Sequence, residues 1–148
     1  MNRSQPVRHI MTPSPATVQP HHKPSDVIDL MIKGGVHHVP VLFGTTLIGL
    51  LDSTALMRAL YSFDGETRQT KEALDQTRSI EDLMQANPVT IGASEPIRRA
   101  AEVLADGWFD CLPVVDDGEL VGMITSADLI LYLLAQDGPA PSPRSAMG

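Results

Sequence analysis

Thr125 and Asp128 are the two residues whose types and spacing best fit the binding of a ligand. They follow the apolar segment 120–124, where a strand is expected to end and a helix, residues 126–134, to begin. The first N–H groups of a helix lack partners within the helix and carry partial positive charge, so they attract phosphate or sugar oxygens. Thr125 adds a hydroxyl there. Asp128 lies on the same face of the first turn, where its carboxylate can accept hydrogen bonds from two ribose hydroxyls.

The same two residues also fit a purely structural interpretation. A hydroxyl residue at a helix start, with an acid near the third helical position, forms a capping box that stabilises the helix without any ligand. Upstream, residues 111–115 are expected to form a buried strand, and Asp116-Asp117-Gly118-Glu119 a hairpin turn into the returning strand. The spacing alone leaves both interpretations open.

An internal repeat runs through most of the chain. Residues 7–61 overlay residues 80–134 without a gap, each residue matching the one 73 positions later, with 11 identities in 55 positions. The overlay predicts one strand-helix-strand-strand-helix unit built twice. Residues 62–79 are then a polar linker, and residues 135–148 a Pro-rich, disordered tail.

Local signals place several elements within each repeat. Ala16-Thr17-Val18 is expected to be a short strand, matched by Thr90-Ile91 in the second repeat. Ser25 is expected to cap the helix that follows in the first repeat, and Ser79 to cap a short helix before the second strand pattern.

The repeated pattern resembles the CBS domain (named after cystathionine beta-synthase), in the tandem arrangement called a Bateman module. The residues that carry the resemblance are Leu112-Pro113-Val114-Val115 and the motif Gly122-x-x-Thr125-x-x-Asp128-Leu129. The resemblance implies a mixed α/β (α+β) fold in which the two repeats pack as a pseudo-two-fold pair. It also implies a regulatory module, not an enzyme, that binds an adenosine-containing ligand in the cleft between the repeats.

The resemblance further implies which residues line the two clefts. In one cleft, the ribose-binding pair Thr125 and Asp128 would work with adenine-binding residues of the first repeat, namely Ala16, Thr17, Val18, His37 and His38. In the other cleft, Thr90, Asp110 and Cys111 would face Asp52 and Ala55. Ala55 lacks the ribose-binding carboxylate, and Asp52 would repel phosphate. The second cleft is therefore expected to be degenerate, either empty or holding an uncharged molecule.

Charge narrows the expected ligand. The chain has a formal net charge of −7, and the helix 126–134 contains no Lys or Arg. AMP, S-adenosylmethionine or a related compound is therefore expected to bind better than ATP, although ATP remains possible. No cofactor or metal is expected.

Composition excludes several classes of partner. An acidic net charge and an aromatic content of 4% argue against a nucleic-acid surface or an anionic membrane. No apolar run approaches the length of a membrane span, and the single cysteine gives no disulfide framework. These features predict a cytoplasmic protein without membrane insertion.

Three other interpretations stay open on the residues alone. His21-His22 and His37-His38, with His9, suggest metal binding and an enzyme, but adjacent strand residues point to opposite faces and no ligand set is completed. Cys111 lies in a predicted buried strand and fits a core residue better than a nucleophile. The third is a structural dimerisation module whose clefts are vestigial and bind no nucleotide.

The apolar residues on the second helix of each repeat predict that the protein forms a homodimer. Apolar residues there exceed what a small fold can cover, which favours a homodimer; they are Leu56, Leu60, Leu129, Ile130, Leu133 and Leu134. A regulated partner protein of unknown identity is also expected, since no output domain is expected in the segments outside the two repeats.

Overall fold

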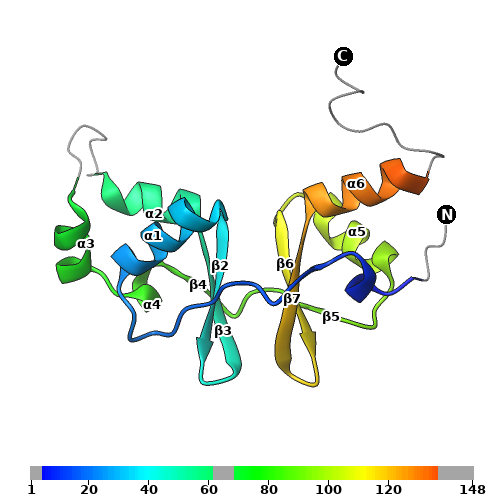
Figure 1. Cartoon of the computed structure of the whole chain (residues 1–148), viewed down its shortest axis with the longest axis horizontal. Coiled ribbons are helices and arrows are strands. Elements are labelled where there is room, and N and C mark those ends of the chain that lie inside the picture. Colours follow the sequence, from blue (N-terminus) through cyan, green and yellow to red (C-terminus); the bar gives the residue numbers. More distant parts are fainter. Residues whose placement is uncertain (1–4, 62–68, 137–148) are drawn as a thin grey trace, which may run out of the picture. The chain divides into compact units, whose positions relative to one another are not determined.

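The computed structural model describes residues 5–61 and 69–136. The elements of the first repeat are η1 (Val7–His9), β1 (Thr12–Pro13), α1 (Pro24–Gly34), β2 (His38–Phe43), β3 (Thr46–Asp52) and α2 (Ser53–Leu60) (Figure 1). Those that follow are α3 (Lys71–Thr77), α4 (Ile80–Leu83), β4 (Gln85–Ala86), β5 (Ile91–Gly92), α5 (Ile97–Ala105), β6 (Cys111–Asp116), β7 (Glu119–Thr125) and α6 (Ser126–Gln136). The predicted mixed α/β fold is confirmed, and the second repeat shows the full strand-helix-strand-strand-helix order.

Parts of the predicted linker and tail lie outside the described residues. Of the linker 62–79, the structure describes residues 69–79, which include α3. Of the tail 135–148, it describes only residues 135 and 136, and these are the last two residues of α6.

Two compact units divide the described residues. The C-terminal unit comprises residues 5–14, 90–116 and 121–136, and the N-terminal unit comprises residues 15–61, 69–89 and 117–120. The units therefore do not coincide with the two repeats. The first residues of each repeat belong to the unit that contains most of the other repeat.

In the C-terminal unit, β5 pairs in parallel with β6, and β6 is joined to β7 by a tight turn whose residues 117–120 belong to the N-terminal unit. Asp117 and Gly118 have φ values of 50° and 79°, as a two-residue type I′ turn requires. This confirms the predicted Asp-Gly turn. Helices α5 and α6 cover the strands around a core formed by Val7, Ile91, Ala93, Ile97, Ala100, Leu104, Leu112, Val114, Ile124 and Leu129.

In the N-terminal unit, β2 and β3 form an antiparallel hairpin that pairs His38 with Asp52. Its core consists of Val18, Val27, Met31, Val39, Val41, Leu51, Leu56 and Ile80. The predicted strand at Ala16-Thr17-Val18 is wrong, since Val18 forms only a single parallel bridge with Val41. Pro15 and Pro20 flank this segment and cannot donate to a ladder, which limits the pairing to one residue.

The turn that opens each repeat completes the core of the other repeat. Val7 of η1 is fully buried with residues of the second repeat, and Ile80 of α4 is fully buried with residues of the first. Met11 then packs on Gly122, and Met84 packs on Gly49, so closely that a Cβ at either glycine would collide with the methionine side chain. Each opening segment is thus held by the opposite repeat.

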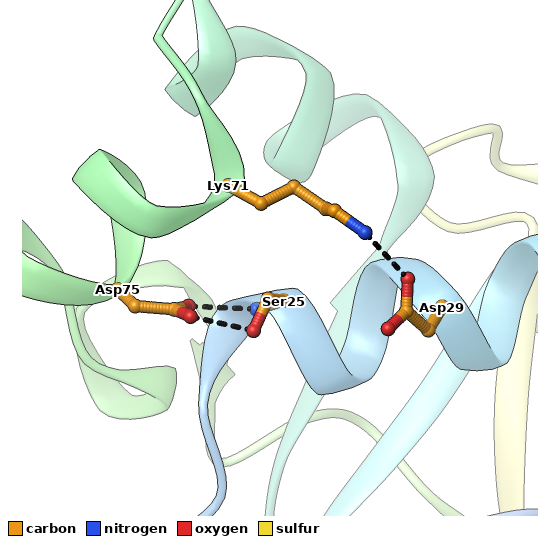
Figure 2. Close-up of polar contacts among 4 residues, drawn as sticks. All are labelled: Ser25, Asp29, Lys71 and Asp75. Carbon is orange, nitrogen blue, oxygen red and sulfur yellow. Dashed lines mark hydrogen bonds and ion pairs between the residues drawn. The ribbon is translucent and has the colours of Figure 1, made fainter.

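Helix α3 is attached to α1 by polar contacts (Figure 2). Helix α1 begins at Pro24 after the N-cap Lys23, so the prediction that Ser25 caps it is wrong. Instead, Ser25 donates both its backbone N–H and its hydroxyl to Asp75 of α3, at 2.8 and 2.5 Å. Lys71 pairs with Asp29 at 3.0 Å, which raises the pKa of Lys71. Leu74 of α3 is fully buried, so this part of the linker is packed structure.

Replacing Asp75 with Ala is expected to lower the free energy of unfolding by about 1–2 kcal/mol, because the first turn of α1 loses a charged acceptor at its positive end. Urea unfolding at pH 7 measures the loss. Asp29→Ala is the matched control, since it breaks an exposed ion pair to the same helix and should shift the midpoint far less. Equal shifts for the two variants would contradict this account of the contact.

Candidate functional site

Thr125 and Asp128 hold each other at the start of α6. Oδ2 of Asp128 accepts a hydrogen bond from the Thr125 backbone N–H at 2.8 Å, and Oγ1 of Thr125 accepts one from the Asp128 N–H at 3.2 Å. Both residues are half-buried. The reciprocal bonds form a capping box, so the structural interpretation of this pair describes its geometry correctly.

The capping bonds leave one carboxylate oxygen of Asp128 and the hydroxyl hydrogen of Thr125 able to bond to a ligand. A carboxylate has two oxygens, and among the described residues no hydrogen bond is recorded to Oδ1 of Asp128. The Thr125 hydroxyl accepts from Asp128 and still has its own hydrogen to donate. Capping therefore fixes the orientation of both side chains and does not exclude a bound sugar.

The start of α6 offers fewer N–H groups than the sequence predicts. The Ser126 N–H is donated to the carbonyl oxygen of Asp110 at 3.2 Å, and the Asp128 N–H is donated to Thr125. The expectation that the first helical N–H groups are unpaired is wrong for these two. Because phosphate binding at a helix start depends on such groups, this end of α6 is less suited to a highly charged phosphate.

Cys111 is a core residue beside the start of α6. Its side chain is buried, and burial raises the pKa of the thiol to about 12, with smaller contributions from the negative charges of Asp110 and Asp128. The thiolate is the reactive form, so this cysteine has no nucleophilic character near neutral pH.

Within the C-terminal unit, the contacts bring together residues that the sequence assigns to both expected clefts. Asp110 and Cys111 had been assigned to the opposite cleft from Thr125 and Asp128, yet all four gather around the start of α6. Thr90 belongs to the same unit and immediately precedes β5.

The remaining predicted residues belong to the N-terminal unit, where α2 begins. The Ser53 N–H is donated to the carbonyl oxygen of His37 at 2.9 Å, and Oδ1 of Asp52 caps α2 by accepting from the Ala55 N–H at 2.7 Å. His38 lies opposite Asp52 in the β2–β3 hairpin. The same unit carries the segment Ala16-Thr17-Val18, in which Ala16 is exposed, Thr17 is half-buried and Val18 is buried.

The histidines do not form a metal site in the part of the chain that the structure describes. No group of three or more His, Cys, Asp or Glu residues there could hold a metal ion. The rings of His21 and His22 lie 4.4 Å apart, but Nδ1 of His22 accepts a hydrogen bond from the Gln19 N–H at 2.9 Å. His22 thus closes a local turn.

One protein-family model matches the chain twice. The model of the CBS domain matches residues 7–62 and again residues 80–135. The chain belongs to the CBS domain family. Each match begins where a repeat of the sequence begins and extends one residue beyond it.

Solved structures of CBS domain pairs share the fold. CBSX2 from Arabidopsis thaliana, solved in complex with AMP, is 26% identical and has a TM-score of 0.75 over 90% of this chain and 99% of that chain. The CBS domain pair of protein MJ0100, solved with 5-methylthioadenosine and S-adenosyl-L-methionine, is 24% identical, with a TM-score of 0.72 over 90% of this chain and 98% of that one. The second likeness concerns the fold alone.

Curated relatives include larger proteins that contain a matching region. A homoserine O-acetyltransferase from Methanocorpusculum labreanum is 28% identical over 88% of this chain, and this chain spans only 24% of that enzyme. It spans 43% of the uncharacterized protein MJ1225 from Methanocaldococcus jannaschii, with 27% identity over 88% of this chain. CBS pairs are typically regulatory, and some occur within enzymes. Among the described residues, no helix is both long and apolar enough to cross a membrane.

Proposed function

We propose that this CBS pair is a regulatory module that binds an adenosine-containing ligand and signals its presence to a partner protein. The observation that carries the proposal is the oriented Thr125–Asp128 pair, in a chain that is 26% identical to a CBS pair solved with AMP. The Asp128 carboxylate would accept hydrogen bonds from the ribose hydroxyls, and the Thr125 hydroxyl would donate to an oxygen of the sugar or its 5′ substituent.

The electrostatics around α6 support a ligand with little negative charge. Asp110 and Asp128 lie together at this end of the C-terminal unit, and α6 contains no Lys or Arg. A helix start contributes only about half a positive charge, and two of its N–H groups here have partners. AMP and S-adenosyl compounds therefore fit better than ATP. The sulfonium of S-adenosylmethionine is a positive charge, which nearby carboxylates favour.

Competition calorimetry in EDTA tests the ligand class. AMP or S-adenosylmethionine is expected to displace ATP readily, because ATP brings several negative charges toward the Asp128 carboxylate. Titration should give one strong site per chain, since only the second repeat has both the Thr and the Asp. Two equivalent sites per chain, or ATP binding tenfold more tightly than either competitor, would overturn this assignment of the ligand.

A purely structural function is the second candidate, and the capping box is the observation that favours it. The Thr125–Asp128 bonds match those of Ser79 and Asp82 at the start of α4, with the same distances of 2.8 and 3.2 Å. If no adenosine compound raises the melting temperature of the protein, the Thr125–Asp128 pair serves the helix alone.

We also propose that two copies of the chain associate. Leu56 and Leu129, two of the residues expected to form the interface, are buried in the cores of their own units. Ile130, Leu133 and Leu134 on α6 are exposed, as is Leu131. Most of the exposed apolar side chains of the two helices are therefore on α6, and α2 adds Met57.

A further inference from the structure

Trp108 is the most exposed of the large apolar side chains in the described residues, with 84% of its surface accessible. It follows Gly107, whose φ of 80° ends α5 in the left-handed region. The next residue, Phe109, packs against the core of the C-terminal unit. The loop thus turns one aromatic ring inward and leaves the other in solvent, which is an unfavourable state for an indole without a partner.

The position of this loop is fixed beside the start of α6. The carbonyl oxygen of Asp110 accepts the hydrogen bond from the Ser126 N–H, two residues after Trp108 in the chain. Two residues of extended chain span at most about 7 Å, so Trp108 lies at the edge of the Thr125–Asp128 site. The first repeat has Gly35 at the matching position, so the indole is specific to this end of the C-terminal unit.

We propose that the indole of Trp108 stacks on the purine base of the ligand and thereby selects a nucleoside over a simple sugar. This rests on the proposed function, because Asp128 must hold the ribose for the base to reach the indole. Stacking on an aromatic side chain requires only the π-face of a base, and it would remove the exposed indole from water. Asp128 and Trp108 would then bind different parts of the same ligand, the sugar and the base.

Intrinsic fluorescence tests the stacking directly, since Trp108 is the only tryptophan of the chain. Adenosine is expected to quench the emission and shift it toward the blue, while ribose 5-phosphate at millimolar concentration should leave it nearly unchanged. By calorimetry, Trp108→Leu should weaken adenosine binding about tenfold and ribose 5-phosphate binding less than twofold. Trp108→Phe should restore most of the affinity for adenosine, because it retains an aromatic face.

Phe43→Leu is the matched control, because Phe43 is also exposed but lies at the β2–β3 hairpin. It should leave both affinities unchanged. If adenosine binds but Trp108→Leu binds it equally well, the stacking is overturned while the proposed function stands. If the wild-type protein binds neither compound, both fail. An emission that depends on protein concentration and not on adenosine would assign Trp108 to a protein interface and also overturn the stacking.

Discussion

Asp128→Ala is expected to weaken the binding of AMP or adenosine by about 10- to 150-fold, because the ribose hydroxyls lose a charged acceptor. The carboxylate is held in place by the Thr125 N–H, so its orientation toward a ligand is set before binding. Preorganisation of this kind makes the loss large for a single side chain. Isothermal titration calorimetry at fixed ionic strength measures the two affinities.

Two variants separate ligand binding from helix capping. Asp128→Asn keeps an oxygen that can accept from the Thr125 N–H, so it should preserve most of the stability while still losing affinity, since the charge is gone. Asp52→Ala removes the equivalent cap from α2 and should destabilise the fold without changing the affinity. Equal affinities for wild type, Asp128→Asn and Asp128→Ala would limit Asp128 to a structural role.

Leu131→Asp is expected to convert a dimer into a monomer at micromolar concentration. Ala127, Ile130, Leu131 and Leu134 follow the i, i+3, i+4, i+7 spacing that places side chains along one stripe of α6. The three large side chains of this stripe are each at least 56% exposed, an amount of apolar surface that marks an interface in a soluble protein. A charge in its centre would remain desolvated and unpaired if two copies associated there.

Light scattering coupled to size exclusion measures the mass of each variant. Phe43→Asp is the control, because it places the same charge on another exposed apolar residue, in the β2–β3 hairpin. The control should remain dimeric and keep the wild-type melting temperature. A monomeric wild type, or a Leu131→Asp variant that stays dimeric, would show that the α6 stripe does not hold two copies together.

Elements with strong local signals were predicted well from the sequence. Asp117-Gly118 favours a turn with two positive φ values, and Ser79 caps α4 as expected, with Asp82 returning a second bond. Ser25 was misassigned because its partner is Asp75, 50 residues away. A hydroxyl residue just before an apolar helical stripe can be either the N-cap or a residue of the first turn. The contact with Asp75 shows that Ser25 is in the first turn.

The site shows the same division. The spacing Thr125-x-x-Asp128 indicated a capping box as one interpretation, and the reciprocal bonds between each side chain and the other residue's N–H agree with it. The pairing of Ser126 with Asp110 joins residues from different elements, and no local pattern marks it. Trp108 was overlooked because a single aromatic residue in a loop has no periodicity. Its adjacency to Gly107, a helix-ending residue, is the signal that could have indicated its exposure.

Each repeat begins with a helical turn, η1 or α4, that packs into the core of the other repeat. This arrangement makes the two repeats dependent on each other. A protein made of one repeat, with the same contacts, would have to obtain its buried turn from a second molecule, as in a domain-swapped dimer. When both repeats are in one polypeptide, the turn of one repeat packs into the other repeat of the same molecule. The effective concentration for this packing is set by the segment that connects the repeats. Because Val7 and Ile80 are both fully buried, each repeat depends on the other for a complete core.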